Sequence, residues 1–431
     1  MTNVKATLAA LAPVVGPTAT RAMAVAREVA RRLADPATVR RTTDASCGPD
    51  GWSPGSLGDG HAGVALLYTG NAPACDARST AHAHLLAAAR HRTGTDGGLF
   101  AGDTGIAFAA LVAAHGGDAY RALRQTLDDT AVRAVAALTV AARSRREVGG
   151  TDLISGLTGL GRHLLAAGRH DAVRHILTTL IDVARPHRVH GRRVPGWWIA
   201  GPPTWDGPQN PFTRGHFNLG LAHGVAGQLA LLSAATRAEV TVPDQHRTAT
   251  TIAEWLIDQL RYDERGPRWP AYLPFTTGED IGPARAAWCY GTPGVARALH
   301  LAGRAFDRPD WSALAVAALN ALLTRPPADW LIGDASLCHG AAGLLRITHR
   351  MAQDTADPAL TAALPSLTER VLAHYTPETP FGFRYTDSKG TTAQDRPGFL
   401  EGAAGVALTL TAVTTSPPSD PTPWDTCLAL V

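Results

Sequence analysis

The sequence predicts an all-α protein built from seven helical hairpins, and three observations carry this prediction. A G-x-x-G unit followed by an apolar segment recurs seven times. Successive first glycines are between 42 (Gly60 to Gly102) and 68 (Gly156 to Gly224) residues apart, which is room for two ordinary helices and their connections. The intervening stretches are rich in Ala and Leu at helical spacing. The seven first glycines are Gly60, Gly102, Gly156, Gly224, Gly291, Gly340 and Gly402.

Each unit is expected to be a hairpin whose second helix starts at the glycine turn. The preceding helices are predicted most clearly over 80–90, 120–143, 248–261 and 311–323, where apolar residues recur three and four apart. Glycine lacks a Cβ, so it accepts unusual dihedral angles and lets backbones crowd together at a helix start. Seven hairpins can stack as an open solenoid or close into a ring, and the repeat alone leaves both arrangements open.

The repeats divide the chain into one main domain and three smaller parts. Residues 1–54 are expected to be an N-terminal helical segment of the same fold, 55–412 the domain of seven repeats, and 413–431 a C-terminal tail. Residues 186–217 depart from the helical pattern, because they are rich in Pro, Gly and Trp and contain β-prone residues. This stretch is expected to be a loop or small β-containing insertion. Its tryptophans either line a groove for a peptide or pack inside the protein: Trp197, Trp198 and Trp205.

Composition excludes several classes of protein. With 40 Lys and Arg against 37 Asp and Glu among 431 residues, the net charge of +3 argues against a strongly basic nucleic-acid binder. No apolar run reaches the roughly 18 residues of a membrane-spanning helix. Five cysteines are too few for a disulfide-built secreted scaffold. The uncharged stretch 6–20 is interrupted by Pro13, Gly16 and Pro17, so it is a poor signal peptide. We therefore expect a cytoplasmic protein with reduced thiols.

Two cysteines lie on repeat turns. Cys289 precedes Tyr290 and Gly291, and Cys338 is followed by His339 and Gly340. If the turns line one rim, two thiols and an imidazole converge. Zinc bound by two thiolates and one imidazole, with an open fourth position, is typical of a catalytic site. Such a site would lower the pKa of an incoming thiol and keep its sulfur nucleophilic, although activation of water remains an alternative. The plainer interpretation is that the two cysteines are buried apolar fillers.

Two further turns carry titratable groups. His223 directly precedes Gly224, and Asp152 lies four residues before Gly156. A histidine with a carboxylate neighbour is an ordinary general acid–base pair. Arg285 lies four residues before Cys289, where a guanidinium would stabilise a developing enolate oxygen. Each residue alone is more often structural, but their shared place on the repeat turns favours a function.

These segments resemble the lanthionine synthetase C-like family, the lanthipeptide cyclases. The resemblance covers about residues 55 to 412 and lies in GHFNLGLAHGVAG, ARAAWCYGTPG, SLCHGAAG and FLEGAAG. It implies an α,α-toroid of seven inner and seven outer helices around one Zn²⁺ per chain. It implies zinc ligands at Cys289, Cys338 and His339. It also implies that the 186–217 insertion lies where the bacterial cyclases carry a small SH2-like subdomain. The implied reaction residues are His223 as proton shuttle, Asp152 as its acidic partner, Arg285 at the enolate and Tyr290 near the metal.

The resemblance also implies an activity and partners. The expected reaction is Michael-type addition of a cysteine thiol to dehydroalanine or dehydrobutyrine, which forms thioether rings in antibiotic biosynthesis. The substrate is a dehydrated precursor peptide of leader and core, and a separate dehydratase and an exporter are expected associates. Three alternatives stay open: addition of glutathione or another thiol to dehydrated residues, glycoside hydrolysis by a pair such as Asp103 and Glu401, and a zinc-stabilised binding scaffold without turnover.

Overall fold

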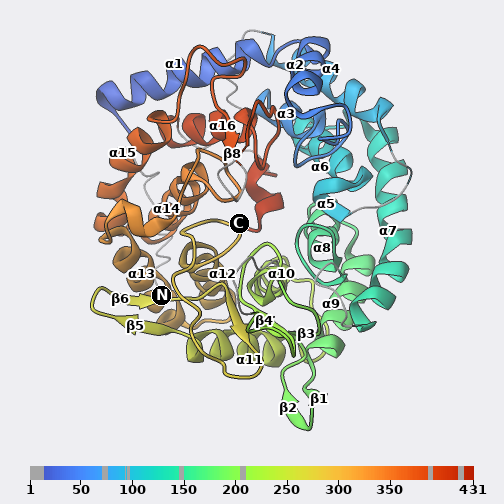
Figure 1. The fold of residues 1–431 in the computed structure, drawn as a ribbon. Helices are drawn as coiled ribbons and strands as arrows, with labels where there is room; N and C mark the ends of the chain where they lie inside the picture. The colour runs from blue at the N-terminus through green and yellow to red at the C-terminus, as the bar shows by residue number, and fades with distance from the viewer. Residues whose placement is uncertain are drawn as a thin grey trace, which may run out of the picture.

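Two concentric layers of helices surround a central axis in the computed structural model (Figure 1). It describes residues 14–69, 76–92, 94, 98–144, 150–203, 210–386, 392–415 and 422–431. The inner helices each begin directly after the first glycine of a repeat: α3 (His61–Leu67), α6 (Asp103–Ala113), α8 (Leu157–Ala166), α10 (Val225–Arg237), α12 (Thr292–Ala305), α14 (Ala341–Thr355) and α16 (Ala403–Thr414). The outer helices are α1 (Gly16–Arg32), α4 (Ala77–Arg90), α7 (Arg121–Ser144), α9 (His170–Ala184), α11 (Gln245–Asp258), α13 (Pro309–Leu323) and α15 (Pro358–Leu372).

The outer helices follow the sequence expectations closely. Three of the four predicted segments match α4, α7 and α13 to within a few residues. The fourth, 248–261, is α11 with an earlier end, because the chain turns after Asp258 and Arg261 starts a strand. The N-terminal segment supplies the seventh outer helix, since α1 packs against α15 and α16. The Val14 N–H also donates to the Val413 carbonyl at 2.8 Å, which ties this segment to the last inner helix.

The expected α,α-toroid with a small β-containing insertion is confirmed. Several short helices and strands complete the fold. Strands β1 (His187–Val189) and β2 (Arg192–Val194) form an antiparallel hairpin that projects from the ring in Figure 1. Among the described residues, no helix is both long and apolar enough to cross a bilayer. The remaining elements are α2 (Pro36–Cys47), α5 (Gly98–Ala101), η2 (Pro327–Trp330), η3 (Trp424–Leu428), β3 (Trp198–Ile199), β4 (His216–Asn218), β5 (Arg261–Asp263), β6 (Gly266–Arg268), β7 (Tyr272–Pro274), β8 (Tyr385–Thr386) and β9 (Ala393–Gln394), with antiparallel pairing in β3–β4–β7, β5–β6 and β8–β9.

A continuous circle of backbone hydrogen bonds shows that the repeats close into a ring. The residues that form it lie two positions before each first glycine, with Leu153 replacing Ile154 as a donor in the third turn. Each N–H donates to the carbonyl of the next turn, and the last turn donates to the first. The bonds run Gly58 to Phe100 (3.0 Å), Phe100 to Ile154 (3.2 Å), Leu153 to Ala222 (2.9 Å), Ala222 to Cys289 (3.3 Å), Cys289 to Cys338 (3.2 Å), Cys338 to Leu400 (2.9 Å) and Leu400 to Gly58 (2.9 Å). The open solenoid is thereby excluded.

The glycines are needed for crowding rather than for unusual dihedral angles. A Cβ on the second glycine of any unit would lie only 1.9 to 2.7 Å from the carbonyl oxygen of the residue three before the first glycine. Of the first glycines only Gly291 has a positive φ, +80°; the other six are extended, with φ between −100° and −133°. The expectation of unusual dihedrals is therefore wrong for six of the seven first glycines, because each inner helix is entered from extended backbone.

Replacing Gly343 with alanine is expected to destabilise the protein strongly. The new Cβ would lie 2.2 Å from the Leu337 carbonyl oxygen, and a backbone atom in a closed ring has little freedom to move. Overpacking of this kind costs about 1–3 kcal/mol or more. Gly333→Ala is the matched control, because its Cβ would meet nothing within 4 Å. Thermal unfolding of both variants checks this, and equal melting temperatures would contradict the packing role of the second glycine.

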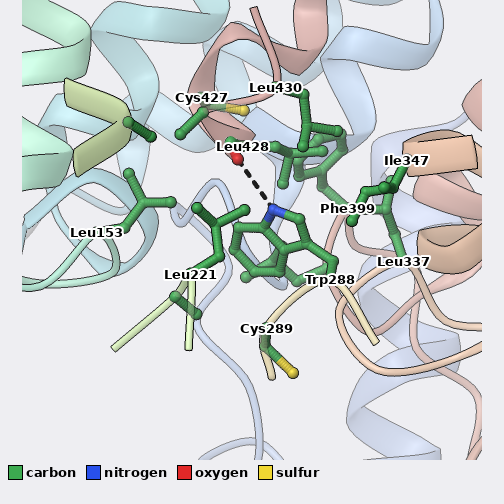
Figure 2. Close-up of a cluster of buried hydrophobic side chains, with 14 of the residues drawn as sticks. Leu153, Leu221, Trp288, Cys289, Leu337, Ile347, Phe399, Cys427, Leu428 and Leu430 are labelled. Atoms are coloured by element: carbon green, nitrogen blue, oxygen red, sulfur yellow. Dashed lines mark hydrogen bonds between the residues drawn. The ribbon is translucent and has the colours of Figure 1, made fainter. Parts of the chain in front are cut away.

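A layer of seven buried apolar side chains lies next to the hydrogen-bonded circle. Each comes from the residue three before a first glycine, and each is fully buried. Figure 2 shows several of them around the toroid axis, with the Cys289 sulfur below the Trp288 indole. This layer separates the rim that carries the polar turn residues from the interior of the toroid. Its members are Leu57, Leu99, Leu153, Leu221, Trp288, Leu337 and Phe399.

Candidate functional site

The turns that lead into the inner helices carry most of the polar residues of interest in two equivalent positions. Because the circle of hydrogen bonds joins these turns, the seven helix N-termini lie at one rim, and their partial positive charges favour anionic groups there. The first position, directly before the first glycine, holds Asp59, Ala101, Ser155, His223, Tyr290, His339 and Glu401. The second, six residues before it, holds Asn218, Arg285, Asp334 and Arg396 in the last four units.

Two adjacent turns bring Cys289, Cys338 and His339 together. Their potential ligand atoms, two sulfurs and one imidazole nitrogen, all lie within 4.8 Å of one another. The backbone bond from the Cys289 N–H to the Cys338 carbonyl, 3.2 Å, holds the two turns side by side. Cys289 is 6% exposed, and Cys338 and His339 are half-buried. The group can therefore hold a metal ion that remains open to a ligand from the rim.

The electrostatics of these three residues suit a cation. A hydrogen bond with Cys289 is the largest cause that raises the pKa of the Cys338 thiol well above its ordinary value, followed by burial. Two thiolates are thus unfavourable here without a positive ion between them. Burial lowers the pKa of His339 and keeps the imidazole neutral, the form that binds metals. Its buried Nε2 has no hydrogen-bond partner among the described residues and lies 3.8 Å from the Asp334 carboxylate.

His223 and Asp152 form a close pair beside this group. The His223 Nδ1 lies 2.5 Å from an Asp152 carboxylate oxygen, although the two residues are 71 positions apart in the chain. The other carboxylate oxygen accepts the Ser155 N–H at 2.9 Å and the Ser155 hydroxyl at 3.2 Å. Asp152 is 2% exposed, whereas the His223 side chain is 37% exposed. A fixed, buried carboxylate therefore orients an imidazole that remains accessible at the rim.

Tyr290 joins the histidine to the metal ligands. Its ring stacks near that of His223, with centroids 6.3 Å apart and planes 27° apart, and it directly follows Cys289 in the chain. Burial, followed by the neighbouring Tyr272, raises the pKa of Tyr290, so the phenol stays protonated. Tyr272, on β7, packs its ring 5.2 Å from that of Tyr290. Strand β7 thus packs against the rim at Tyr290.

Arg285 provides an unpaired positive charge close to the same group. It is half-buried, and its charge contributes to the lowered pKa of His339. Within the part of the chain that the structure describes, its guanidinium makes no hydrogen bond and no ion pair. A partly buried cation without a partner is suited to bind an anionic or carbonyl oxygen of a ligand.

Two carboxylates, those of Glu401 and Asp59, flank the metal ligands on the side away from His223. Glu401 pairs with Arg396 at 2.8 Å, and Asp59 lies 3.7 Å from the same guanidinium. Burial, then the Asp59 charge, raises the pKa of Glu401 to about 7. Three residues near the metal ligands were not among those predicted from the sequence: Asp59, Arg396 and Asp334. Their repeat positions, shared with His223, His339 and Arg285, were the signal that could have identified them.

Other expectations for the site meet mixed outcomes. Trp197 is 7% exposed and packs against Trp255, with ring centroids 5.2 Å apart, so it belongs to the interior rather than to a groove. Trp205 lies outside the described residues. Asp103 and Glu401 were named as a possible carboxylate pair of a glycoside hydrolase. Asp103 pairs with Arg92 at 3.1 Å near the start of α6, whereas Glu401 pairs with Arg396, so the two carboxylates bind different arginines.

The ring of helical hairpins and the Cys₂His group together define a helical toroid with a candidate metal site at one rim. A family profile described as "Lanthionine synthetase C-like protein" matches residues 51–429, which is most of the chain. The chain therefore belongs to the lanthionine synthetase C-like family. Among solved structures it is similar to one described as "Nisin cyclase", with a TM-score of 0.71 and 21% identity over 88% of this chain and 92% of that chain. A search of curated protein sequences gave no match.

Proposed function

We propose that this protein is a zinc-dependent lanthipeptide cyclase, which adds peptide cysteine thiols to dehydroalanine or dehydrobutyrine. The observation that carries the proposal is the convergence of the Cys289, Cys338 and His339 ligand atoms within 4.8 Å, beside the His223–Asp152 pair at 2.5 Å. Membership of the lanthionine synthetase C-like family supports it. A zinc ion held by these three residues would supply Lewis-acid activation of the thiol of a bound peptide.

The proposed reaction needs two proton movements, and we assign the second to residues of this chain. The thiol gives its proton to solvent water, sulfur bonds to the β-carbon, and the electron pair of the C=C bond moves to form an enolate. Arg285, whose guanidinium is unpaired among the described residues, stabilises the enolate oxygen. His223 takes up a proton from solvent and delivers it to Cα, while Asp152 holds the imidazole by its Nδ1 and orients it for the transfer.

Tyr290 and the sheet beside it have a supporting role in this proposal. The raised pKa keeps the Tyr290 phenol protonated, so it is a hydrogen-bond donor at the rim rather than a base. Its packing against Tyr272 of β7 limits how water reaches the site from that side. The peptide is a precursor of leader and core that a separate dehydratase has dehydrated and that passes on to an exporter. The protein acts in the cytoplasm.

Incubation of the protein with zinc and a peptide that contains cysteine and dehydroalanine tests the proposal. Ring formation leaves the peptide mass unchanged but removes the free thiol, so treatment with a thiol-alkylating reagent is expected to add no mass to the product. A peptide that remains fully alkylated after incubation with zinc-loaded protein would contradict the proposed activity.

The same assay separates the proposal from addition of an external thiol. With glutathione present, a cyclase is expected to yield a peptide of unchanged mass, whereas an enzyme that adds glutathione yields a peptide heavier by one glutathione per dehydrated residue. A chelator is expected to stop the reaction. A glycoside hydrolase that needs no metal would instead stay active in the presence of the chelator. Tight peptide binding without any product would instead indicate a binding scaffold.

A further inference from the structure

The C-terminal segment enters the axis of the toroid. Residues expected as a tail, 413–431, include the end of α16 and, at 424–431, the short helix η3 with three more residues. In Figure 1 this segment ends at the centre of the ring. Asp425 and every residue from Cys427 to Leu430 are at most 1% exposed. The segment is therefore a part of the interior.

Three inner helices each supply a buried arginine that binds this segment. The three lie at the same repeat position, six residues after the first glycine, and none is more than 5% exposed. A buried guanidinium is costly unless its N–H groups are satisfied, so an equivalent arginine on three helices indicates a receptor built for the segment. Arg162 donates to the carbonyls of Thr426 (3.2 Å) and Val431 (3.0 Å), Arg297 donates to the Leu430 carbonyl (2.9 Å), and Arg346 donates to the Asp425 carboxylate (2.9 Å).

Helix η3 contacts the layer of buried apolar side chains next to the metal ligands. The Trp288 indole N–H donates to the Leu428 carbonyl at 2.9 Å, as Figure 2 shows. Trp288 is fully buried, and Cys289 is the next residue. The equivalent position holds leucine or phenylalanine in the other six turns, so Trp288 is the one side chain of this layer that can donate a hydrogen bond to the segment.

We propose that residues 424–431 form a positioning element for the metal site. The segment holds the Trp288 indole from the side opposite to Cys289, and because Trp288 is packed on all sides, this fixes the backbone and the sulfur of Cys289. The three arginines anchor the segment to α8, α12 and α14, so that the position of Cys289 is set by the interior of the toroid as well as by the rim. This inference rests on the proposed zinc site and adds a determinant of its geometry.

Two substitutions in the full chain test the link without touching a ligand. Trp288→Phe removes the N–H donor and keeps an aromatic ring, and Asp425→Asn weakens the anchoring of the segment by Arg346 and Arg350, which donates to the same carboxylate at 2.6 Å. Both are expected to weaken zinc affinity about 10- to 100-fold, as loss of an outer-shell partner does. Zinc affinity is measured by competition with a chelator, together with the absorption spectrum of the cobalt-substituted protein and the melting temperature.

Trp269→Phe is the matched control. Trp269 is 1% exposed and its indole N–H also donates to a backbone carbonyl, that of Leu256 at 2.6 Å in outer helix α11. We expect it to lower the melting temperature and to leave zinc affinity and the cobalt spectrum unchanged. Wild-type affinity and spectrum in both Trp288→Phe and Asp425→Asn, with lower melting temperatures, would overturn the positioning role and leave the proposed function standing. If the wild-type protein bound no zinc, both would fail.

Discussion

Replacing Cys338 with alanine is expected to abolish zinc binding and ring formation together. The variant keeps one thiolate and one imidazole, which leave the charge of the ion uncompensated and the site short of a ligand. Loss of Lewis-acid activation removes several kcal/mol of transition-state stabilisation, so cyclisation should fall by about 10³-fold or more. Elemental analysis of the purified variant and the alkylation assay measure the two effects. Cys289→Ala is expected to behave in the same way.

Cys47→Ala is the matched control for this prediction. Cys47 is a free, half-buried thiol at the end of α2 and is not one of the residues that converge at the rim. We expect it to retain one zinc per chain and wild-type cyclisation. Full zinc content in both Cys289→Ala and Cys338→Ala would show that the ligand assignment is wrong.

Zinc binding is also expected to weaken as the pH falls. A metal ligand must be a thiolate, and the hydrogen bond with Cys289 and burial raise the pKa of the Cys338 thiol, so protons compete with the metal more strongly than at an ordinary cysteine. Chelator competition at several pH values gives the slope. The pH dependence of zinc affinity is therefore a further test that Cys338 is a zinc ligand.

The second large effect is expected at His223. His223→Ala should retain zinc and lose cyclisation by about 10²- to 10⁴-fold, the usual contribution of a general acid or base. The side chain is 37% exposed, so its removal should leave the fold intact. Asp152→Asn should also slow cyclisation, because an amide cannot stabilise the imidazolium in the same way. The loss should be smaller than in His223→Ala, since the imidazole itself is still present. Rates from the alkylation assay and zinc content measured on the same samples separate catalysis from metal binding.

Asp128→Asn is the control for the carboxylate. Asp128 lies 2.7 Å from His163 in a buried pair between α7 and α8, which resembles the Asp152–His223 pair but does not involve a turn of the rim. We expect Asp128→Asn to lower stability and to leave the rate of cyclisation by the folded protein unchanged. Wild-type ring formation by His223→Ala would remove the proposed role of the histidine.

The repeat and most of the candidate site could be predicted from the sequence, since both depend on residues at fixed positions relative to the G-x-x-G units. The G-x-x-G units marked all seven inner helices, and the position before each first glycine marked His223, Tyr290 and His339. Closure into a ring did not follow from the repeat itself, because it depends on the hydrogen bond from the Leu400 N–H to the Gly58 carbonyl, a contact between the ends of the domain.

Other features depend on tertiary contacts that have no local signal. The C-terminal segment reads as a short polar and apolar tail, and only its binding by arginines of three helices places it on the axis. The early end of α11 has a similar origin, since residues 261–263 pair with β6 instead of continuing the helix. Asp59 and Glu401 lie in different parts of the sequence and become neighbours through Arg396.

The proposed zinc site, with three protein ligands and a position open to a peptide thiol, is tested most directly by X-ray absorption at the zinc edge. The spectrum is measured with and without a dehydrated substrate peptide. We expect one zinc per chain with two sulfur ligands at about 2.3 Å and lighter N or O ligands in the free protein. Addition of the peptide should increase the sulfur ligands from two to three. An unchanged ligand set in the presence of a peptide that is being cyclised, or four ligands supplied by the protein alone, would contradict it.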